Sequence, residues 1–227
     1  MQDLVKRLQR HYGAPQLPPA QGPFELILWE NACYLLPDAR RAAVFEGLRT
    51  RVGLTPRAIL DAEFDTLLPL ATMGGMRPDV RVERWREISQ IAETEFDGDV
   101  NRVLQLPPAK ARKALKLFPN IGDPGAEKIL MMCGAHAGLA LESNSLRVLT
   151  RVGFGRQQKN YGTTYRSVQE SLAGSLPKRA AELTRSYFTL RQHGQETCRR
   201  TTPDCMACPV RELCAAGKSA TVPVSPW

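Results

Sequence analysis

The sequence predicts an all-helical protein, on two observations. No stretch of the 227 residues shows the alternation of apolar and polar side chains that marks a half-buried strand. The apolar residues recur instead in segments of helical length, separated by Pro and Gly. The chain also has no internal repeat and no low-complexity tract, so we expect a globular helical fold.

The first half of the chain begins with a short basic amphipathic helix, followed by a linker rich in Pro and Gly over residues 13–23. Residues 24–36 are too apolar for a surface helix and predict a buried one. Thr55 and Pro56 form a clear helix start, because Pro is favoured at the first helical position. The helices predicted in this half cover residues 1–12, 24–36, 38–50, 56–70, 80–95 and 99–105.

The second half begins after a pair of prolines, Pro107 and Pro108, which end one helix and start the next. Its final residues, 216–227, predict a surface extension. The helices predicted in this half cover residues 108–118, 124–135, 142–154, 161–174 and 177–193.

Composition narrows the class of protein. Hydrophobic residues make up 43% and charged residues 24%, which is ordinary for a soluble globular chain. No apolar run approaches the roughly 18 residues that would suggest a membrane span. The net charge of +8 favours a polyanionic partner such as DNA.

Four cysteines near the C-terminus are the most informative feature of the sequence. Cys198, Cys205, Cys208 and Cys214 follow the pattern C-x6-C-x2-C-x5-C within 17 residues. A disulfide staple is disfavoured, because the chain shows no signal peptide and is long enough to fold without staples. A zinc site usually has two short C-x2-4-C knuckles, and only one is present. Four thiolates on one wrapped loop favour a 4Fe–4S cluster, with zinc and disulfides as the alternatives.

Cys33 and Cys133 lie outside this loop, in apolar stretches, and we expect them to be buried free thiols. Reduced cysteines and a labile cluster together predict a cytoplasmic protein, associated with the nucleoid.

A second informative segment joins two predicted helices at residues 117–126. Asp123 is a good N-cap and Pro124 a good first helical residue, so the turn is Pro-Asn-Ile-Gly, with Asn120 and Gly122 able to adopt positive φ. Such a turn aims backbone N–H groups outward beside a helix N-terminus, where a DNA phosphate fits. An ordinary helix corner is the alternative.

Both segments resemble one family. The flanking residues His193-Gly194-x-x-Thr197-Cys198, Pro203-x-Cys205-x-x-Cys208 and Leu213-Cys214 resemble the cluster loop of endonuclease III and of the adenine-mismatch glycosylase. These are iron–sulfur members of the helix-hairpin-helix DNA glycosylase superfamily. The turn resembles their hairpin motif, L-P-G-[VI]-G-x-x-[TS]-A, with Asn120 at the first Gly and Ile121 in the apolar slot. The resemblance spans residues 23–215.

The resemblance implies a two-lobed all-α fold. A helical barrel domain would cover residues 23–136, including the hairpin at 117–126. An iron–sulfur domain would combine residues 1–22 with 137–215, followed by the tail at 216–227. The cleft between the two lobes would receive a base flipped out of the duplex.

The family's chemistry is only partly present. Bifunctional members carry a nucleophilic lysine two residues after the second hairpin Gly, and this position is Pro124. Lys128 lies one helical turn further on, where it is expected to contact phosphate or solvent. The resemblance therefore implies a glycosylase without a lysine nucleophile.

Two glutamates stand where the family places carboxylates. Glu142 occupies the Asp position of a V-D-T-H-x-x-R-V-like stretch, where it would stabilise an oxocarbenium-like sugar and help to activate water. Its alternative role is a helix N-terminal cap. Glu30 matches the acid of the adenine glycosylase that protonates the base, and burial would raise its pKa and keep it a proton donor. The alternative for Glu30 is a solvated position or a pair with an arginine.

The remaining predicted DNA contacts are spread along the chain. Leu35 stands where endonuclease III has a Gln that fills the gap left by a flipped nucleotide, and it would act as an apolar wedge. Met76 is a weaker wedge candidate. The full set of predicted DNA-binding residues is Asn120, Ile121, Gly122, Gly125, Lys128, Leu35, Arg199 and Arg200.

The predicted function is excision of a damaged or mismatched base from double-stranded DNA by a monomeric, water-using glycosylase. The enzymatic alternative is a bifunctional endonuclease III that also cleaves the strand. The non-enzymatic alternative is a lesion-binding protein that kept the fold and lost the chemistry.

Overall fold

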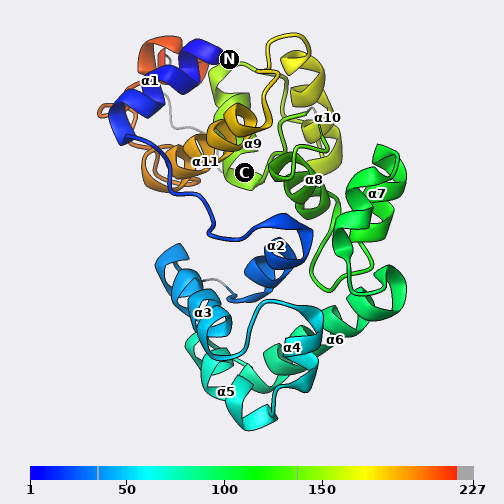
Figure 1. The fold of residues 1–227 in the computed structure, drawn as a ribbon. Helices are drawn as coiled ribbons and strands as arrows, with labels where there is room; N and C mark the ends of the chain where they lie inside the picture. Colours follow the sequence, from blue (N-terminus) through cyan, green and yellow to red (C-terminus); the bar gives the residue numbers. More distant parts are fainter. Residues whose placement is uncertain (35, 137, 219–227) are drawn as a thin grey trace. The chain divides into compact units, whose positions relative to one another are not determined.

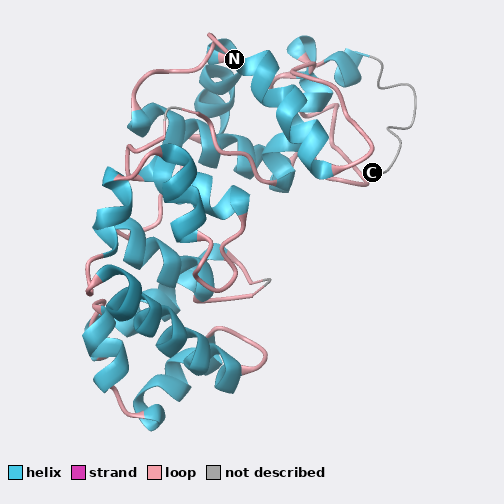
Figure 2. Cartoon of the chain, turned by 90° about the vertical axis from the view of Figure 1, so that its right-hand side faces the viewer, coloured by secondary structure: helices cyan, strands magenta, loops and turns pink. Residues whose placement is uncertain are grey.

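The computed structural model describes residues 1–34, 36–136 and 138–218. Within these ranges every regular element is a helix and none is a strand, as Figure 2 shows. The all-helical prediction is therefore confirmed. The chain divides into two compact units, Pro18–Ala135 and Met1–Leu17 with His136–Trp227. Figure 1 labels helices α1 to α11.

The unit Pro18–Ala135 is built around one apolar core. Trp85, Phe45 and Phe118 are its largest buried side chains. Burial of one such side chain contributes about 1.5–3 kcal/mol. Its helices are α2 (Gly22–Asn31), α3 (Asp38–Arg51), α4 (Pro56–Asp61), α5 (Phe64–Met73), α6 (Pro78–Phe96), the 3-10 helix η1 (Val100–Gln105), α7 (Pro108–Leu115) and α8 (Asp123–Met132).

Helix α2 is the buried helix that its composition predicts. Leu26, Ile27, Leu28 and Trp29 are all at most 6% exposed. The helix ends at Asn31, five residues before the predicted end at 36. There the backbone carbonyl of Asn31 accepts a hydrogen bond from Trp85 Nε1 at 3.3 Å. The Trp85 side chain thus satisfies the Asn31 carbonyl, which in a longer helix would have accepted a backbone hydrogen bond.

Helix α4 begins as predicted but is shorter. Thr55 Oγ1 accepts a hydrogen bond from Ala58 N at 3.2 Å, and Pro56 is the first helical residue. The single helix predicted over residues 56–70 is wrong, because the backbone at Ala62 and Glu63 is extended and separates α4 from α5.

The second unit combines the N-terminal helix with the C-terminal third of the chain. Helix α1 packs on α11 and buries Leu4, Val5 and Leu8. Part of the predicted surface extension is helical, since α12 includes Gly217, and residues 219–227 lie outside the described residues. The helices of this unit are α1 (Gln2–Tyr12), α9 (Ser143–Val152), α10 (Tyr161–Leu172), α11 (Ala180–Glu196), the 3-10 helix η2 (Arg211–Leu213) and α12 (Ala215–Lys218).

No helix in the described part of the chain is both long enough and apolar enough to cross a membrane.

Candidate functional site

The hairpin between α7 and α8 contains the predicted turn, but the residues with the positive φ and the N-cap position differ in part from the prediction. Asn120 adopts φ of 60°, whereas Gly122 has φ of −90° and ψ of −173°, which is extended backbone. Gly122 is the N-cap of α8, so the prediction that Asp123 caps this helix is wrong. The Asp123 carboxylate instead pairs with Lys116 Nζ, at 2.9 and 3.0 Å.

The first turn of α8 therefore has no side-chain cap. Uncapped N–H groups at a helix N-terminus form a place for an anion. A Cβ added at Gly122 would meet nothing closer than Pro124 Cδ at 3.9 Å. The backbone at this turn is thus approachable from outside.

The turn is fastened to α2 by Asn31, which the sequence analysis did not identify. Asn31 is 3% exposed, and its Nδ2 donates to the carbonyls of Ile27 and Pro119 at 3.0 and 3.1 Å. The Asn120 amide lies 2.9 Å from Asn31 Oδ1 and 3.1 Å from Arg84 Nη1. A buried amide inside an otherwise apolar run is the signal that could have revealed this contact.

Glu30 and Lys128 form an ion pair between α2 and α8. The Glu30 Oε2 atom lies 2.5 Å from Lys128 Nζ, and the two side chains are 21% and 14% exposed. This contradicts the predicted exposure of Lys128 to solvent, while its contact with a phosphate stays a prediction. A cation at this distance stabilises the charged carboxylate, which opposes the predicted role of Glu30 as a proton donor.

Glu142 is the N-cap of α9 and is held by four hydrogen bonds. Its Oε2 accepts from Asn144 N at 3.0 Å and from Asn144 Nδ2 at 2.8 Å. Its Oε1 accepts from Ser145 N at 2.6 Å and from Ser145 Oγ at 3.0 Å. An ionised carboxylate offers about four lone-pair positions, so the cap occupies the whole group. The capping role weighed from the sequence is realised, and the negative charge is fixed in position.

Arg147 connects this cap to the cysteine loop within the same unit. Its Nη2 donates to Asn144 Oδ1 at 2.8 Å and to the Gly194 carbonyl at 2.7 Å. Its Nε donates to the Cys198 carbonyl at 3.0 Å. The residue that orients the cap of α9 therefore also holds the first cysteine of the loop.

The cysteine loop gathers four free thiols around one cavity. Cys198, Cys205, Cys208 and Cys214 all line it. Among the described residues, no group of three or more His, Cys, Asp or Glu side chains is arranged to hold a single metal ion. Burial raises the pKa of the Cys208 thiol to about 11 and also raises the pKa of Cys214. Thiols this desolvated ionise readily only beside a compensating positive charge.

The wall of this cavity suits an anionic group bound through sulfur. Arg151 Nη1 lies 3.4 Å from Cys198 Sγ, and Gly217 N donates to Cys214 Sγ at 3.2 Å. Arg151 Nε is buried and meets no acceptor in the part of the chain that the structure describes. The carbonyls of Arg199 and Arg200 accept from Arg151 at 2.7 and 2.9 Å, while their own side chains are exposed.

Of the two predicted wedge residues, the structure describes Met76, which lies on a loop of the other unit. Met76 is 79% exposed, and Leu35 lies outside the described residues. Beneath this loop the buried Arg81 donates to the carbonyls of Gly75 and Met76, each at 3.2 Å. Tyr34, 66% exposed, is a further large side chain that the loops present to solvent.

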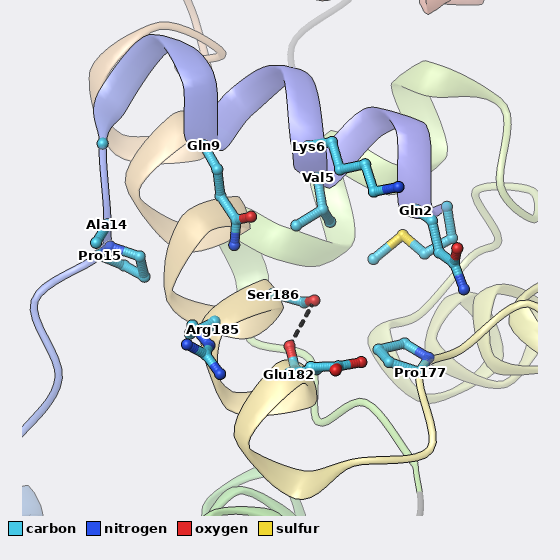
Figure 3. A pocket seen from close by; sticks show the side chains of 12 residues that line it. Gln2, Val5, Lys6, Gln9, Ala14, Pro15, Pro177, Glu182, Arg185 and Ser186 are labelled. Carbon is cyan, nitrogen blue, oxygen red and sulfur yellow. Dashed lines mark hydrogen bonds between the residues drawn. The ribbon is translucent and has the colours of Figure 1, made fainter.

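A hollow of about 660 Å³ lies between α1 and α11 (Figure 3). Lys6, Glu182 and Arg185 are among its charged lining residues, and Ser186 Oγ bonds to the Glu182 carbonyl at 2.7 Å. None of the residues predicted to act in binding or chemistry lines it.

No protein-family model matches the chain. An endonuclease III from Sulfolobus acidocaldarius is 26% identical over 179 residues, which cover 78% of this chain and 74% of that protein. A thymine/uracil-DNA glycosylase from Pyrobaculum aerophilum is 27% identical over 214 residues, which cover 92% of this chain and 87% of that protein.

Solved structures of two DNA-repair proteins share the fold of this chain. A trapped endonuclease III–DNA covalent intermediate aligns with a TM-score of 0.72 at 18% identity, over 97% of each chain. A thermostable thymine-DNA glycosylase aligns with a TM-score of 0.74 at 14% identity, over 96% of each chain. In sequence and in fold, the chain is therefore similar to the endonuclease III-like helix-hairpin-helix DNA glycosylases.

Proposed function

We propose that this protein is a base-excision repair glycosylase that hydrolyses the N-glycosyl bond of a damaged or mismatched base in double-stranded DNA. Relatives named endonuclease III and thymine/uracil-DNA glycosylase, and the shared fold, support this activity. The net charge of +8 suits a polyanionic substrate.

The hairpin is the observation that carries the proposal. The positive φ of Asn120 turns the chain sharply, and α8 begins without a side-chain cap. The N–H groups of that first turn would hold a backbone phosphate on any DNA sequence. Asn31 and the Asn120 amide fasten the turn to the buried α2, so the phosphate site is rigid.

Glu142 would act in the chemistry as a fixed negative charge. Glycosyl transfer develops positive charge on the sugar, and a preorganised carboxylate stabilises that charge without reorganisation. Because its four acceptor positions are filled by α9, Glu142 is better suited to electrostatic stabilisation than to deprotonating a water. Of the two catalytic roles that the sequence suggests for Glu142, we therefore propose stabilisation of the sugar cation and not activation of water.

The four loop cysteines would hold a 4Fe–4S cluster. The arrangement of Cys198, Cys205, Cys208 and Cys214 around one cavity, with Arg151 beside it, supports this assignment. A cubane cluster takes four thiolates. When bound, it would order the loop that also anchors Arg147, and hence the cap of α9.

The absence of a lysine at position 124 makes the proposed enzyme monofunctional. Pro124 carries no amine that could form a Schiff base with the sugar. Lys128, the next lysine along α8, is engaged with Glu30. The abasic product should therefore leave the enzyme with its strand intact.

A lesion-binding protein without chemistry is the second candidate, and one observation favours it. The hydrogen bonds of Glu142 satisfy its carboxylate as an ordinary helix cap would. In that case the hairpin would bind DNA while α9 would contribute only stability.

A panel of duplexes, each with one lesion or mismatch, tests the proposal. The holoprotein is incubated with each duplex, and abasic sites are revealed by hot alkali. Excision of at least one base supports a glycosylase, and nicking before alkali supports the bifunctional alternative. Tight binding to damaged duplexes without any excision would support the lesion-binding protein instead.

A further inference from the structure

A chain of polar side chains leads from the N-terminal helix to the cysteine loop. Tyr12, the last residue of α1, places its hydroxyl 2.6 Å from Thr197 Oγ1 and 2.9 Å from His193 Nδ1. The other ring nitrogen, His193 Nε2, lies 3.8 Å from Cys208 Sγ. Tyr12 is thus separated from these partners by more than 180 residues of sequence.

The imidazole at the centre of the chain is enclosed. His193 is 1% exposed, and its two nitrogens face Tyr12 and Cys208. A buried ring with two fixed neighbours has its tautomer set by what those neighbours can donate or accept.

The directions of the hydrogen bonds follow from the ligand. A cysteine bound to a metal is a thiolate and has no proton to donate. His193 Nε2 must then carry the proton and donate it toward Cys208 Sγ, so Nδ1 must accept. Tyr12 donates to Nδ1, which leaves the Tyr12 oxygen to accept from the Thr197 hydroxyl.

We propose that Tyr12 is a positioning residue for the cluster, fixing His193 as a hydrogen-bond donor to the Cys208 thiolate. The inference rests on the cluster assigned under the proposed function. Hydrogen bonds to cluster sulfurs stabilise the more negative state and raise the reduction potential. The hydrogen bond from His193 also stabilises the Cys208 thiolate. The cluster should therefore be lost more slowly when Tyr12, His193 and Cys208 are all linked by these hydrogen bonds.

Helix α1 thereby becomes part of the cluster environment. Leu4 and Leu8 seat α1 in the core of its unit at 2% and 0% exposure, which holds Tyr12 at the end of the helix. Loss of the Tyr12 hydroxyl would free the His193 ring to adopt the other tautomer, in which Nε2 has no proton to donate.

The test compares substitutions that separate the donor from the ring. Tyr12→Phe removes only the hydroxyl. His193→Gln places an amide nitrogen near the Nε2 position, whereas His193→Asn keeps a polar group near Nδ1 and loses the donor to Cys208. Tyr165→Phe is the control, because its hydroxyl accepts a hydrogen bond from Gln169 on the same helix, α10.

Voltammetry on anaerobically purified holoprotein should give a lower reduction potential for Tyr12→Phe and for His193→Asn. His193→Gln should restore a value near that of the wild type, and Tyr165→Phe should not shift. Iron release to a chelator should be severalfold faster in the two variants with the lowered potential.

Two results would overturn the inference, and they are distinguishable. The first is a Tyr12→Phe variant with a full iron and sulfide content and an unchanged reduction potential. This result would show that the hydrogen bonds from Tyr12 through His193 do not tune the cluster, although the cluster is present. Wild-type protein with stoichiometric zinc and no sulfide would remove the cluster itself. If His193→Asn fails to fold, Tyr12→Phe alone decides the first question.

Discussion

The starts of α8 and α9 solve the same problem in opposite ways. Every helix begins with backbone N–H groups that lack partners within the helix. At α9, Glu142 supplies both carboxylate oxygens to that turn. At α8, Gly122 supplies no side chain, and the neighbouring Asp123 turns away to Lys116.

Under the proposed function, the difference would separate DNA binding from the chemistry of excision. An open helix start attracts an anion and suits a DNA phosphate, whereas a closed start retains a negative charge of its own and suits a cationic sugar. The start of α9 would repel a phosphate, and the start of α8 would not stabilise a cationic sugar. Substitutions at the two starts should therefore affect binding and excision separately.

The largest effect is expected at the closed start. Glu142→Gln removes the charge at nearly constant shape and should lower the rate of excision by about 100-fold or more, the order found when a preorganised stabilising group is lost. Binding to lesion DNA should persist, because the interaction counts mainly in the transition state. Single-turnover excision and equilibrium binding on the same duplex measure the two quantities.

Glu142→Gln also weakens the N-cap of α9, because the glutamine NH₂ group would face backbone N–H donors. A control is needed for this loss of a cap. Asn160→Ala removes the cap of α10, whose Oδ1 accepts from Thr163 N at 2.9 Å, and should cost about 1 kcal/mol of stability without slowing excision. Glu142→Asp keeps the charge and should retain most activity. Full excision by Glu142→Gln would assign Glu142 to capping alone.

The next prediction concerns position 124 of α8, where Pro124 provides no amine. Borohydride should trap no covalent adduct between the wild type and DNA, because Pro124 cannot form a Schiff base. Lys128→Arg keeps the positive charge beside Glu30 but replaces the amine with a guanidinium, so it should behave as the wild type does. Trapping that disappears in Lys128→Arg would show that the open start contributes chemistry after all.

At the open start, Gly122→Ala should weaken binding by about 2 kcal/mol, the order of one hydrogen bond to a charged group. The added methyl has free space and no strained φ, so stability should be unchanged and the loss should be equal on all DNA sequences. Gly162→Ala, near the start of α10, is the matched control. Binding curves at several salt concentrations, with thermal unfolding of each variant, provide the measurement, and an affinity independent of salt would contradict the phosphate contact.

A smaller effect than that of Gly122→Ala is expected from Asp123→Asn. The exposed pair with Lys116 contributes little stability, as surface ion pairs generally do. Removing a negative charge beside the proposed phosphate should tighten binding by about 1 kcal/mol at low salt and by less at high salt. Weaker binding in Asp123→Asn would mean that Asp123 orders the turn more than it repels DNA.

The sequence predicts those parts of the molecule that depend on neighbours in the chain. Thr55 and Pro56 start α4 through a side-chain cap and a fixed φ, both of which are local properties, and the closely spaced cysteines line one cavity. The break between α4 and α5 is not predictable in this way, because no Gly or Pro marks it in the sequence.

Contacts between distant segments account for the other differences. The pair of Glu30 with Lys128 and the contact of Tyr12 with His193 join residues far apart in the chain, and a single sequence carries no sign of either. Asn120 accepts the positive φ that its position requires, but only the fold reveals that its side chain also meets Asn31.

That double use of Asn120 links three positions in evolution. Glycine at 120 would preserve the backbone turn but remove the amide that lies 2.9 Å from Asn31 Oδ1 and 3.1 Å from Arg84 Nη1, leaving the buried Asn31 oxygen without this partner. A change at 120 is therefore favourable only together with changes at 31 and 84. Among descendants of this chain, the residues at these three positions should covary, and a search for relatives should treat them as one unit.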